Sequence, residues 1–146
     1  MSALALHWRL RVIGLVLVVP PLVHVAPLPR ITAVLGRRTR RGLAAEAGGA
    51  AETPVAMLVR EVDFWLGRLP WPWRGTCLKR ATILYGLLRR AGADVALHVG
   101  VKRTREGAFT AHAWLVRDGA PYLEPVADTP ESFRVIATFP AESAPA

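Results

Sequence analysis

Apolar residues in the middle of this chain recur at the spacing of an α-helix. Between residues 53 and 69 they recur every three or four positions, which predicts a helix with one apolar face. Thr53 can cap the start of this helix and Pro70 should end it. A second helix is predicted over residues 76–90, because its apolar side chains form a broad surface and Gly92 follows closely.

The apolar spacing changes to two residues after the second helix, and this period predicts β-strands. Four strands are expected, over residues 95–101, 109–117, 121–125 and 133–139. Asp118-Gly119 stands between the second and third of these segments and is a strong signal for a tight hairpin turn. Two helices followed by antiparallel strands predict an α+β fold.

The N-terminal part of the chain is strongly apolar, and no residue between Arg11 and Arg30 carries a formal charge. Four prolines stand in this stretch: Pro20, Pro21, Pro27 and Pro29. We expect them to break any continuous helix, which makes the stretch a poor membrane span, since a span needs about 20 apolar residues. A signal peptide is also poorly supported, because His24 occupies the cleavage motif. The preferred prediction is a short hydrophobic helix that packs on a partner, on a membrane surface or on the domain itself.

Length and composition favour one small domain with an N-terminal extension. Residues 1–52 are predicted to be a hydrophobic, basic region that ends in an Arg-, Ala- and Gly-rich linker, and residues 53–146 to be the folded domain. Hydrophobic residues make up 52% of the chain, which excludes global disorder. The single cysteine excludes a disulfide within the chain and a multi-cysteine zinc site, and it fits a cytoplasmic, reducing compartment.

The chain is strongly basic, with a formal net charge of +8 at pH 7. Such a charge favours anionic partners, namely nucleic acid, a membrane surface or an acidic peptide. The basic residues form short clusters and not one long tract, and the sequence contains no nucleic-acid-binding motif. We therefore expect no nucleic-acid partner, and peripheral membrane contact through the N-terminal hydrophobic segment stays an open alternative.

Cys77 is the residue that points most directly to chemistry, because it stands where the second predicted helix begins. Unpaired backbone N–H groups and the positive end of the helix dipole stabilise a thiolate there, and Arg74, Lys79 and Arg80 add positive charge. The same N–H groups can hold an oxyanion in acyl transfer. The alternative is a buried structural cysteine, which is the usual state of a single cysteine.

A nucleophilic cysteine needs a general base and a group that orients that base. His112 lies in a predicted strand and is the candidate base, whereas His98 lies in another strand and is interpreted as structural. Glu124, on the following strand, is the preferred orienting acid, because a tight turn can bring it beside His112. Asp118 is the alternative acid, although the hairpin turn already accounts for an Asp-Gly pair.

Three tryptophans are candidates for the walls of a substrate cleft: Trp71, Trp73 and Trp114. The first two stand in a Pro-rich aromatic loop before Cys77, and the third is two residues beyond His112. Ordinary core packing is an equally good interpretation of all three side chains.

Several motifs, taken together and in this order, resemble the lasso-peptide leader peptidases, which are transglutaminase-like cysteine proteases. The motifs are Leu69-Pro70-Trp71, Thr76-Cys77-Leu78-Lys79-Arg80-Ala81, Leu97-His98-Val99-Gly100-Val101, Ala111-His112-Ala113-Trp114-Leu115 and Asp118-Gly119. The resemblance implies a papain/transglutaminase-like core, in which a central helix packs on an antiparallel sheet. It implies Cys77 as the nucleophile and His112 as the base. The family usually has an aspartate as the third residue, and Glu124 is the nearest match here.

The resemblance also implies an activity, namely removal of the leader from a ribosomally made lasso-peptide precursor during its maturation. The implied partners are the precursor peptide, a small leader-binding protein that presents it, and the macrolactam cyclase that acts next. We expect neither a cofactor nor a metal. The residues alone leave two alternatives open: another acyl-transfer enzyme on the same scaffold, such as a transglutaminase or amidase, and a non-catalytic, membrane-associated peptide-binding module.

Overall fold

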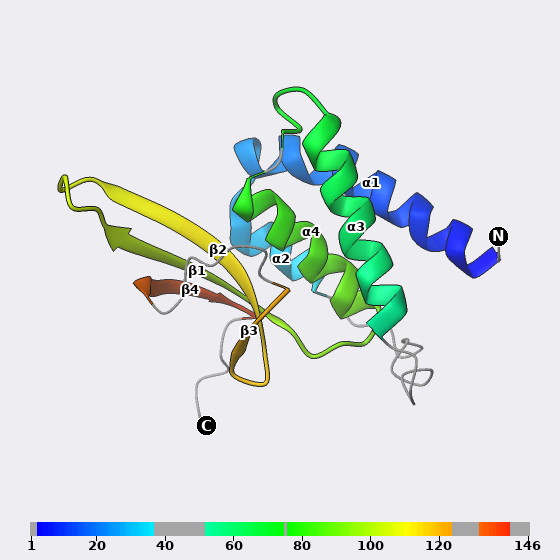
Figure 1. The fold of residues 1–146 in the computed structure, drawn as a ribbon. Coiled ribbons are helices and arrows are strands. Elements are labelled where there is room, and N and C mark those ends of the chain that lie inside the picture. Colours follow the sequence, from blue (N-terminus) through cyan, green and yellow to red (C-terminus); the bar gives the residue numbers. More distant parts are fainter. Residues whose placement is uncertain (1–2, 37–51, 75, 124–131, 141–146) are drawn as a thin grey trace.

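The computed structural model describes residues 3–36, 52–74, 76–123 and 132–140, and it shows a helical layer beside a sheet (Figure 1). The helices are α1 (Ala3–Val25), α2 (Leu28–Leu35), α3 (Glu52–Arg68) and α4 (Cys77–Arg90). The strands are β1 (Ala96–Arg103), β2 (Phe109–Arg117), β3 (Ala120–Tyr122) and β4 (Arg134–Phe139). The two helices and four strands predicted from residue 53 onward are all present, so the α+β fold is confirmed.

The sheet is antiparallel and has the strand order β3-β2-β1-β4. Strands β1 and β2 pair along nearly their whole length, and this register places Gly100 opposite His112. Between β2 and β3, Asp118 and Gly119 have φ angles of 53° and 77°. Positive φ at both central positions is what a type I′ turn requires, so the predicted hairpin is confirmed.

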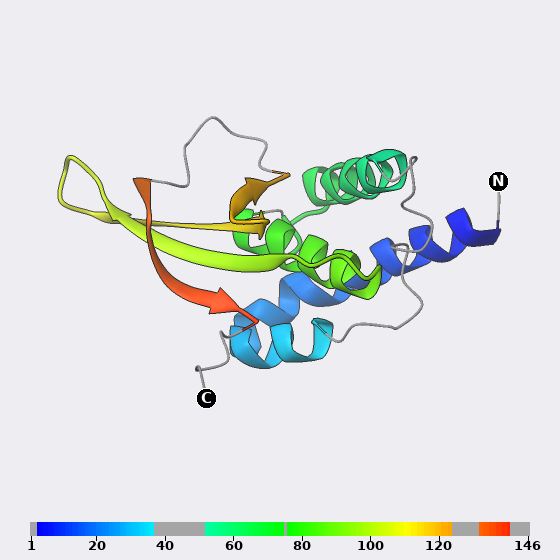
Figure 2. The ribbon, with the colours of Figure 1, turned by 90° about the horizontal axis from the view of Figure 1, so that it is seen from below.

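Helix α4 lies at the centre of the fold. It packs against β1 and β2 on one side and against the three other helices on its remaining sides, and Figure 2 shows it between α3 and the α1–α2 pair. All residues from 81 to 88 are buried. Gly86 allows α2 to approach, because a Cβ atom at this position would lie 3.3 Å from the Cβ atom of Leu35. The helix that begins at Cys77 is therefore held on every side.

Helix α1 is continuous, although Pro20 and Pro21 lie inside it. The expectation that these prolines break the helix is wrong. A proline lacks the N–H that would bond to the carbonyl four residues earlier, so Pro21 leaves the Leu17 oxygen without its helical donor. The indole N–H of Trp73 donates to this oxygen at 2.9 Å. A side chain from the loop between α3 and α4 thus replaces a hydrogen bond that the helix itself cannot make.

The other two prolines do mark a break, as predicted. Pro27 is the N-cap residue of α2, and Pro29 stands in the first turn of that helix. A first turn suits proline, because its first N–H groups have no partner within the helix. The chain therefore bends between α1 and α2 and continues as a second, shorter helix.

The two N-terminal helices belong to the same hydrophobic core as the rest of the structure. This core contains Val12, Val16 and Val19 from α1 and Ile31 and Leu35 from α2, packed with residues of α3, α4 and the sheet. The predicted linker lies outside the described residues, except for its last residue, which begins α3. A domain boundary between residues 52 and 53 stays a prediction. The structure shows that α1 and α2 pack on α4.

By length and composition, residues Leu6–Val25 form a helix that is long and apolar enough to cross a membrane. Core helices of soluble proteins and signal sequences share these two properties. In the 18-residue window that carries this hydropathy, 22% of the residues are buried inside the fold. The expectation of a poor span rested on a break at the first two prolines, and the structure shows no break there.

Candidate active site

Cys77 is the first residue of α4. Thr76 precedes it as the N-cap residue, and the Thr76 side-chain oxygen accepts a hydrogen bond from the backbone N–H of Lys79. Residues in the first turn of a helix have N–H groups without a partner inside the helix, and these groups point along the positive end of the dipole. The Cys77 side chain is exposed. The structure therefore gives this thiol the position that the sequence predicted, and it shows that Cys77 is not a buried structural residue.

Lys79 holds the loop that precedes Cys77. Its side chain is only 4% exposed, and its ammonium group donates hydrogen bonds to the backbone oxygens of Pro72 at 2.8 Å and Arg74 at 3.1 Å. A buried ammonium group needs such acceptors, because burial without partners is strongly unfavourable. Lys79 was expected to add positive charge near the thiol. The structure shows in addition that it anchors the turn that carries Cys77.

A cavity of about 320 Å³ opens beside Cys77. Its lining comes from α3, the start of α4, β2 and the end of β3: Asp63, Leu66, Gly67, Thr76, Cys77, Arg80, Ala81, His112, Ala113, Trp114, Leu115, Tyr122 and Leu123. The fold thus brings Cys77 and His112, which are far apart in the sequence, to one cavity. Their shared cavity is consistent with the predicted pair, and the roles of nucleophile and base stay a prediction.

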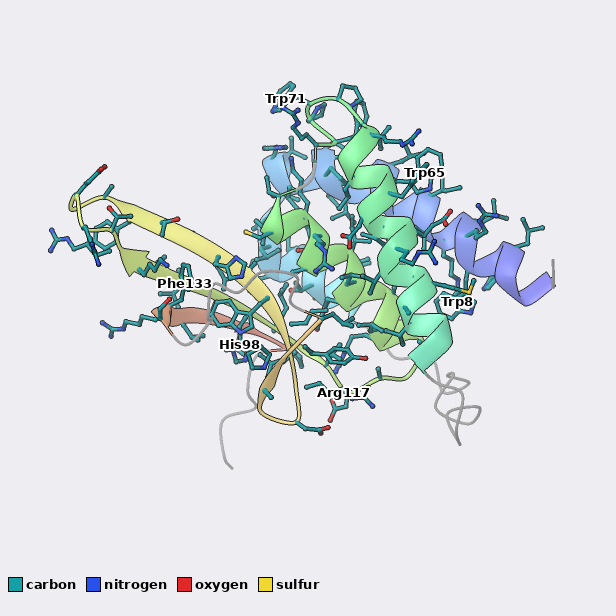
Figure 3. All side chains as sticks on the ribbon, in the orientation of Figure 1. Trp8, Trp65, Trp71, His98, Arg117 and Phe133 are labelled. Carbon is teal, nitrogen blue, oxygen red and sulfur yellow. The ribbon has the colours of Figure 1, made fainter. Side chains whose placement is uncertain are left out.

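The imidazole of His112 lies among aromatic rings. The Trp114 ring is stacked with it at a centroid distance of 5.7 Å and an interplanar angle of 18°, and the Phe133 ring lies 5.3 Å away. His98 contacts the same tryptophan at 5.8 Å, and Figure 3 shows His98 and Phe133 on the sheet, away from the helices. Gly100 makes room for this cluster, since a Cβ atom there would lie 2.8 Å from the Trp114 ring. These contacts restrict the orientation of the His112 ring.

Asp63 and Arg80 form a second feature of the cavity, which sequence reasoning missed. The guanidinium of Arg80 donates two hydrogen bonds to the Asp63 carboxylate, at 2.6 and 3.2 Å. It donates a third to the backbone oxygen of Leu123, at 3.0 Å. Arg80 therefore ties α3, α4 and the end of the β2–β3 hairpin together. No local motif signals this contact, because the partners come from three separate segments.

Of the two candidate acids, the structure describes the position of Asp118 but not that of Glu124. Glu124 lies outside the described residues, so its predicted role stays a prediction. The residue before it, Leu123, lines the cavity. Asp118 lies in the hairpin turn, six residues beyond His112 along β2 and its end, which is about 20 Å of extended chain. The structure therefore does not bring Asp118 to His112.

Of the three tryptophans predicted to form the walls of the cleft, only one lines the described cavity. Trp114 lines the cavity, as expected. Trp73 bonds to α1 through the Leu17 oxygen, and Trp71 is 77% exposed and lies near the His24 ring of α1. The cavity lining described above contains neither Trp71 nor Trp73. The contacts of their side chains described here are with the N-terminal helix, and the sequence of the aromatic loop alone did not indicate them.

The described part of the chain contains no group of three or more His, Cys, Asp or Glu side chains arranged to hold a metal ion. The cavity brings together a thiol, an imidazole and the start of a helix, with its unpaired backbone N–H groups. A thiol at a helix start can attack a carbonyl carbon and form an acyl-enzyme when an imidazole in the same cavity takes its proton.

The family of the chain follows from a comparison with models of protein families. Residues 22–138 match the model of the transglutaminase-like superfamily. The chain belongs to this superfamily. The matched residues include α2, α3, α4 and nearly all of the sheet, and with them Cys77 and His112. Comparison with curated proteins and with solved structures found no significant match.

Membership in the transglutaminase-like superfamily indicates which reactions the residues of the cavity can support. The superfamily includes cysteine hydrolases, and its scaffold is consistent with acyl transfer. The matched segment begins within α1, well before residue 53, where the folded domain was predicted to start. The C-terminal end of α1 and the whole of α2 thus belong to the matched region, in agreement with their packing on α4.

Proposed function

We propose that this protein is a cysteine peptidase that removes the leader from a lasso-peptide precursor. The observation that carries the proposal is the shared cavity of Cys77, at the start of α4, and His112, on β2, in a chain of the transglutaminase-like superfamily. The specific substrate is supported by the resemblance of the Cys77 and His112 motifs to those of the leader peptidases. The coarser statement, a cysteine hydrolase or acyl-transfer scaffold, rests on the superfamily alone.

In the proposed first step, the Cys77 sulfur attacks the scissile carbonyl carbon and its proton passes to His112. The carbon–nitrogen bond then breaks, and His112 returns the proton to the departing amine of the core peptide. The leader stays on Cys77 as a thioester. In the second step, His112 takes a proton from water, which attacks the thioester and releases the leader with a free carboxylate. The sulfur recovers the proton.

Backbone and side-chain groups support these steps. The N–H groups in the first turn of α4 are placed to stabilise the oxyanion that forms beside Cys77. Trp114 and Phe133 restrict the His112 ring, and Glu124 is proposed to orient it further through a hydrogen bond. Lys79 and Arg80 hold the segments on either side of the cavity in place. No cofactor enters the scheme.

The proposed partners follow from the substrate. A small leader-binding protein presents the precursor, and the new amine of the core peptide passes to an ATP-using cyclase that closes the macrolactam ring. A precursor made by ribosomes meets this enzyme in the cytoplasm. The single, exposed thiol is consistent with that reducing compartment.

The test is a cleavage assay with the purified chain, the precursor and the leader-binding protein, followed by mass spectrometry. The parent should release an intact leader with a free carboxylate. Cys77→Ala and His112→Ala should each lower the rate by at least about a thousandfold. His24→Ala, which alters a histidine outside the cavity, is the matched control and should cleave at the parent rate. Cleavage by Cys77→Ala at the parent rate would refute the mechanism.

A second candidate function is acyl transfer to an amine, which the superfamily favours as a class. The acyl-enzyme on Cys77 is the same, and the two activities differ only in whether water or an amine attacks the thioester. Adding a primary amine to the cleavage assay separates them. Free carboxylate as the main product supports the peptidase, whereas an amide adduct in excess supports the transferase.

A further inference from the structure

Helix α1 has two apolar faces, and the described residues cover only one of them. Val12, Val16 and Val19 are buried against the other helices. On the other side, four large apolar residues are about half exposed or more: Leu6, Leu10, Leu17 and Val18. A helix that is apolar all round is normally enclosed by protein or in contact with lipid. The exposed apolar face of α1, defined by these four residues, therefore needs an explanation.

Two arginines border the exposed apolar face. At about 100° per residue, Arg9 and Arg11 lie to either side of its midline, each about a quarter turn away. Arg9 pairs with Glu61 of α3 at 3.2 Å, and the Arg11 guanidinium lies over the Trp8 ring at 5.2 Å. Long basic side chains beside an apolar face can reach lipid headgroups while their stems cover apolar surface.

Trp71 extends this surface beyond the helix. It comes from the loop between α3 and α4, its ring is 77% exposed, and it lies beside His24 near the end of α1 (Figure 3). Val25, the last residue of α1, is also exposed. Tryptophan is enriched at membrane interfaces, because its ring is apolar and its N–H is polar. Trp71 does not line the cavity, and contact with a membrane interface would account for its exposed ring.

We propose that α1 and Trp71 dock the protein on an anionic lipid surface, with the helix lying in the plane of the interface. Lipid is favoured over a protein partner by charge, since the chain carries a formal net charge of +8. An anionic leaflet attracts this charge while the apolar face enters the acyl boundary. Docking is independent of the proposed peptidase activity, because the exposed face lies outside the cavity lining.

The same residues argue against a spanning orientation. Val12, Val16 and Val19 would have to leave the hydrophobic core, which they share with α3 and α4, for α1 to enter the bilayer on all sides. Withdrawing three buried side chains would expose the apolar surface of the helices that remain. The in-plane orientation keeps this core intact and covers only the face that the fold leaves exposed.

The test is co-sedimentation of the full chain with vesicles. We expect binding to phosphatidylglycerol/phosphatidylcholine vesicles, at least about tenfold weaker binding to phosphatidylcholine alone, and a decrease with salt. The double variant Leu10→Asn/Leu17→Asn should weaken binding at least about tenfold, since both residues are exposed and the fold should persist. Ile136→Asn, an exposed apolar residue of β4, is the control and should bind as the parent does.

A second measurement keeps the proposal testable if the double variant fails to fold. Brominated anionic lipids should quench part of the parent's tryptophan fluorescence, and Trp71→Phe should remove that quenched part. No binding to anionic vesicles, or parent-like binding by a folded double variant, would overturn the proposal. Resistance to alkaline carbonate extraction would overturn the in-plane orientation. Cleavage of a soluble precursor by the double variant at the parent rate is expected in every case, so the two proposals fail separately.

Discussion

Helix α1 is more apolar in composition than α4, which contains Lys79, Arg80, Arg89 and Arg90, and yet the fold covers α1 less completely. Helix α4 is enclosed by the sheet and three helices, and Leu87 in it is 0% exposed. Helix α1 is covered on one side, and Leu10 on its other side is 60% exposed. Enclosure fixes the start of α4, where Cys77 stands. The burial of a helix in this fold therefore follows from the elements that pack around it and not from its apolar content alone.

The largest change in stability is expected when a buried leucine of α4 is shortened, and the same change on the exposed face of α1 should have little effect. Leu87→Ala should lower the free energy of unfolding by about 2–5 kcal/mol, because it leaves a cavity in the enclosed core. Leu10→Ala, the matched change on the exposed face, should alter it by less than about 0.5 kcal/mol. Urea unfolding of both variants checks the pair. Similar losses in the two variants would contradict the distinction between an enclosed and a half-covered helix.

The next effect concerns the start of α4. Lys79→Met keeps a long apolar stem but removes the ammonium group, so the Pro72 and Arg74 oxygens lose their donor. We expect a loss of about 1–3 kcal/mol in unfolding free energy and a lower kcat for leader release with little change in KM. Arg60→Met, on the exposed side of α3, is the control. Parent-like kcat in Lys79→Met would show that the loop does not position Cys77.

A smaller effect tests the contact that joins α1 to the loop before α4. Trp73→Phe removes the N–H that donates to the Leu17 oxygen and should cost about 0.5–1.5 kcal/mol. Pro21→Ala restores the helical N–H to that oxygen, so the cost of Trp73→Phe should shrink in the Pro21→Ala background. Urea unfolding of the two single variants and the double variant gives the coupling energy. A coupling of zero would mean that Trp73 does not replace the missing helical bond.

The smallest expected effect is that of a change at Asp118, one of the two candidate acids. Asp118→Asn keeps a residue that tolerates positive φ and removes the carboxylate, so leader release should stay at the parent rate. Glu124→Gln should lower the rate at least about tenfold, if Glu124 orients His112 as proposed. Steady-state cleavage rates check both variants. A loss in Asp118→Asn with none in Glu124→Gln would reverse the proposed assignment.

Local patterns in the sequence were enough to predict the elements that form around the site. The helical spacing after residue 53, the alternation after residue 95 and the Asp118-Gly119 turn each act through neighbours in the chain, and the structure confirms all three. The position of Cys77 at a helix start and of His112 on a strand was predictable for the same reason. Their shared cavity followed from the order of these elements.

Features that depend on distant partners were not predictable in this way. Continuity of α1 through Pro21 depends on Trp73, which lies 56 residues from Leu17 in the sequence. The contacts of Arg80 with Asp63 and Leu123 join three segments. Phe133 reaches His112 from the residue just before β4, which is the far edge strand. Each of these contacts exists only after the helices have packed on the sheet.

The central claim is that Cys77 forms a thioester with the leader in the cavity it shares with His112. Rapid acid quenching of the cleavage reaction, followed by intact mass analysis, tests it directly. The parent chain should gain the mass of the leader minus one water, and digestion should place this mass on the peptide that contains Cys77. Cys77→Ala should neither gain this mass nor release the leader. Leader release by Cys77→Ala at the parent rate would contradict it.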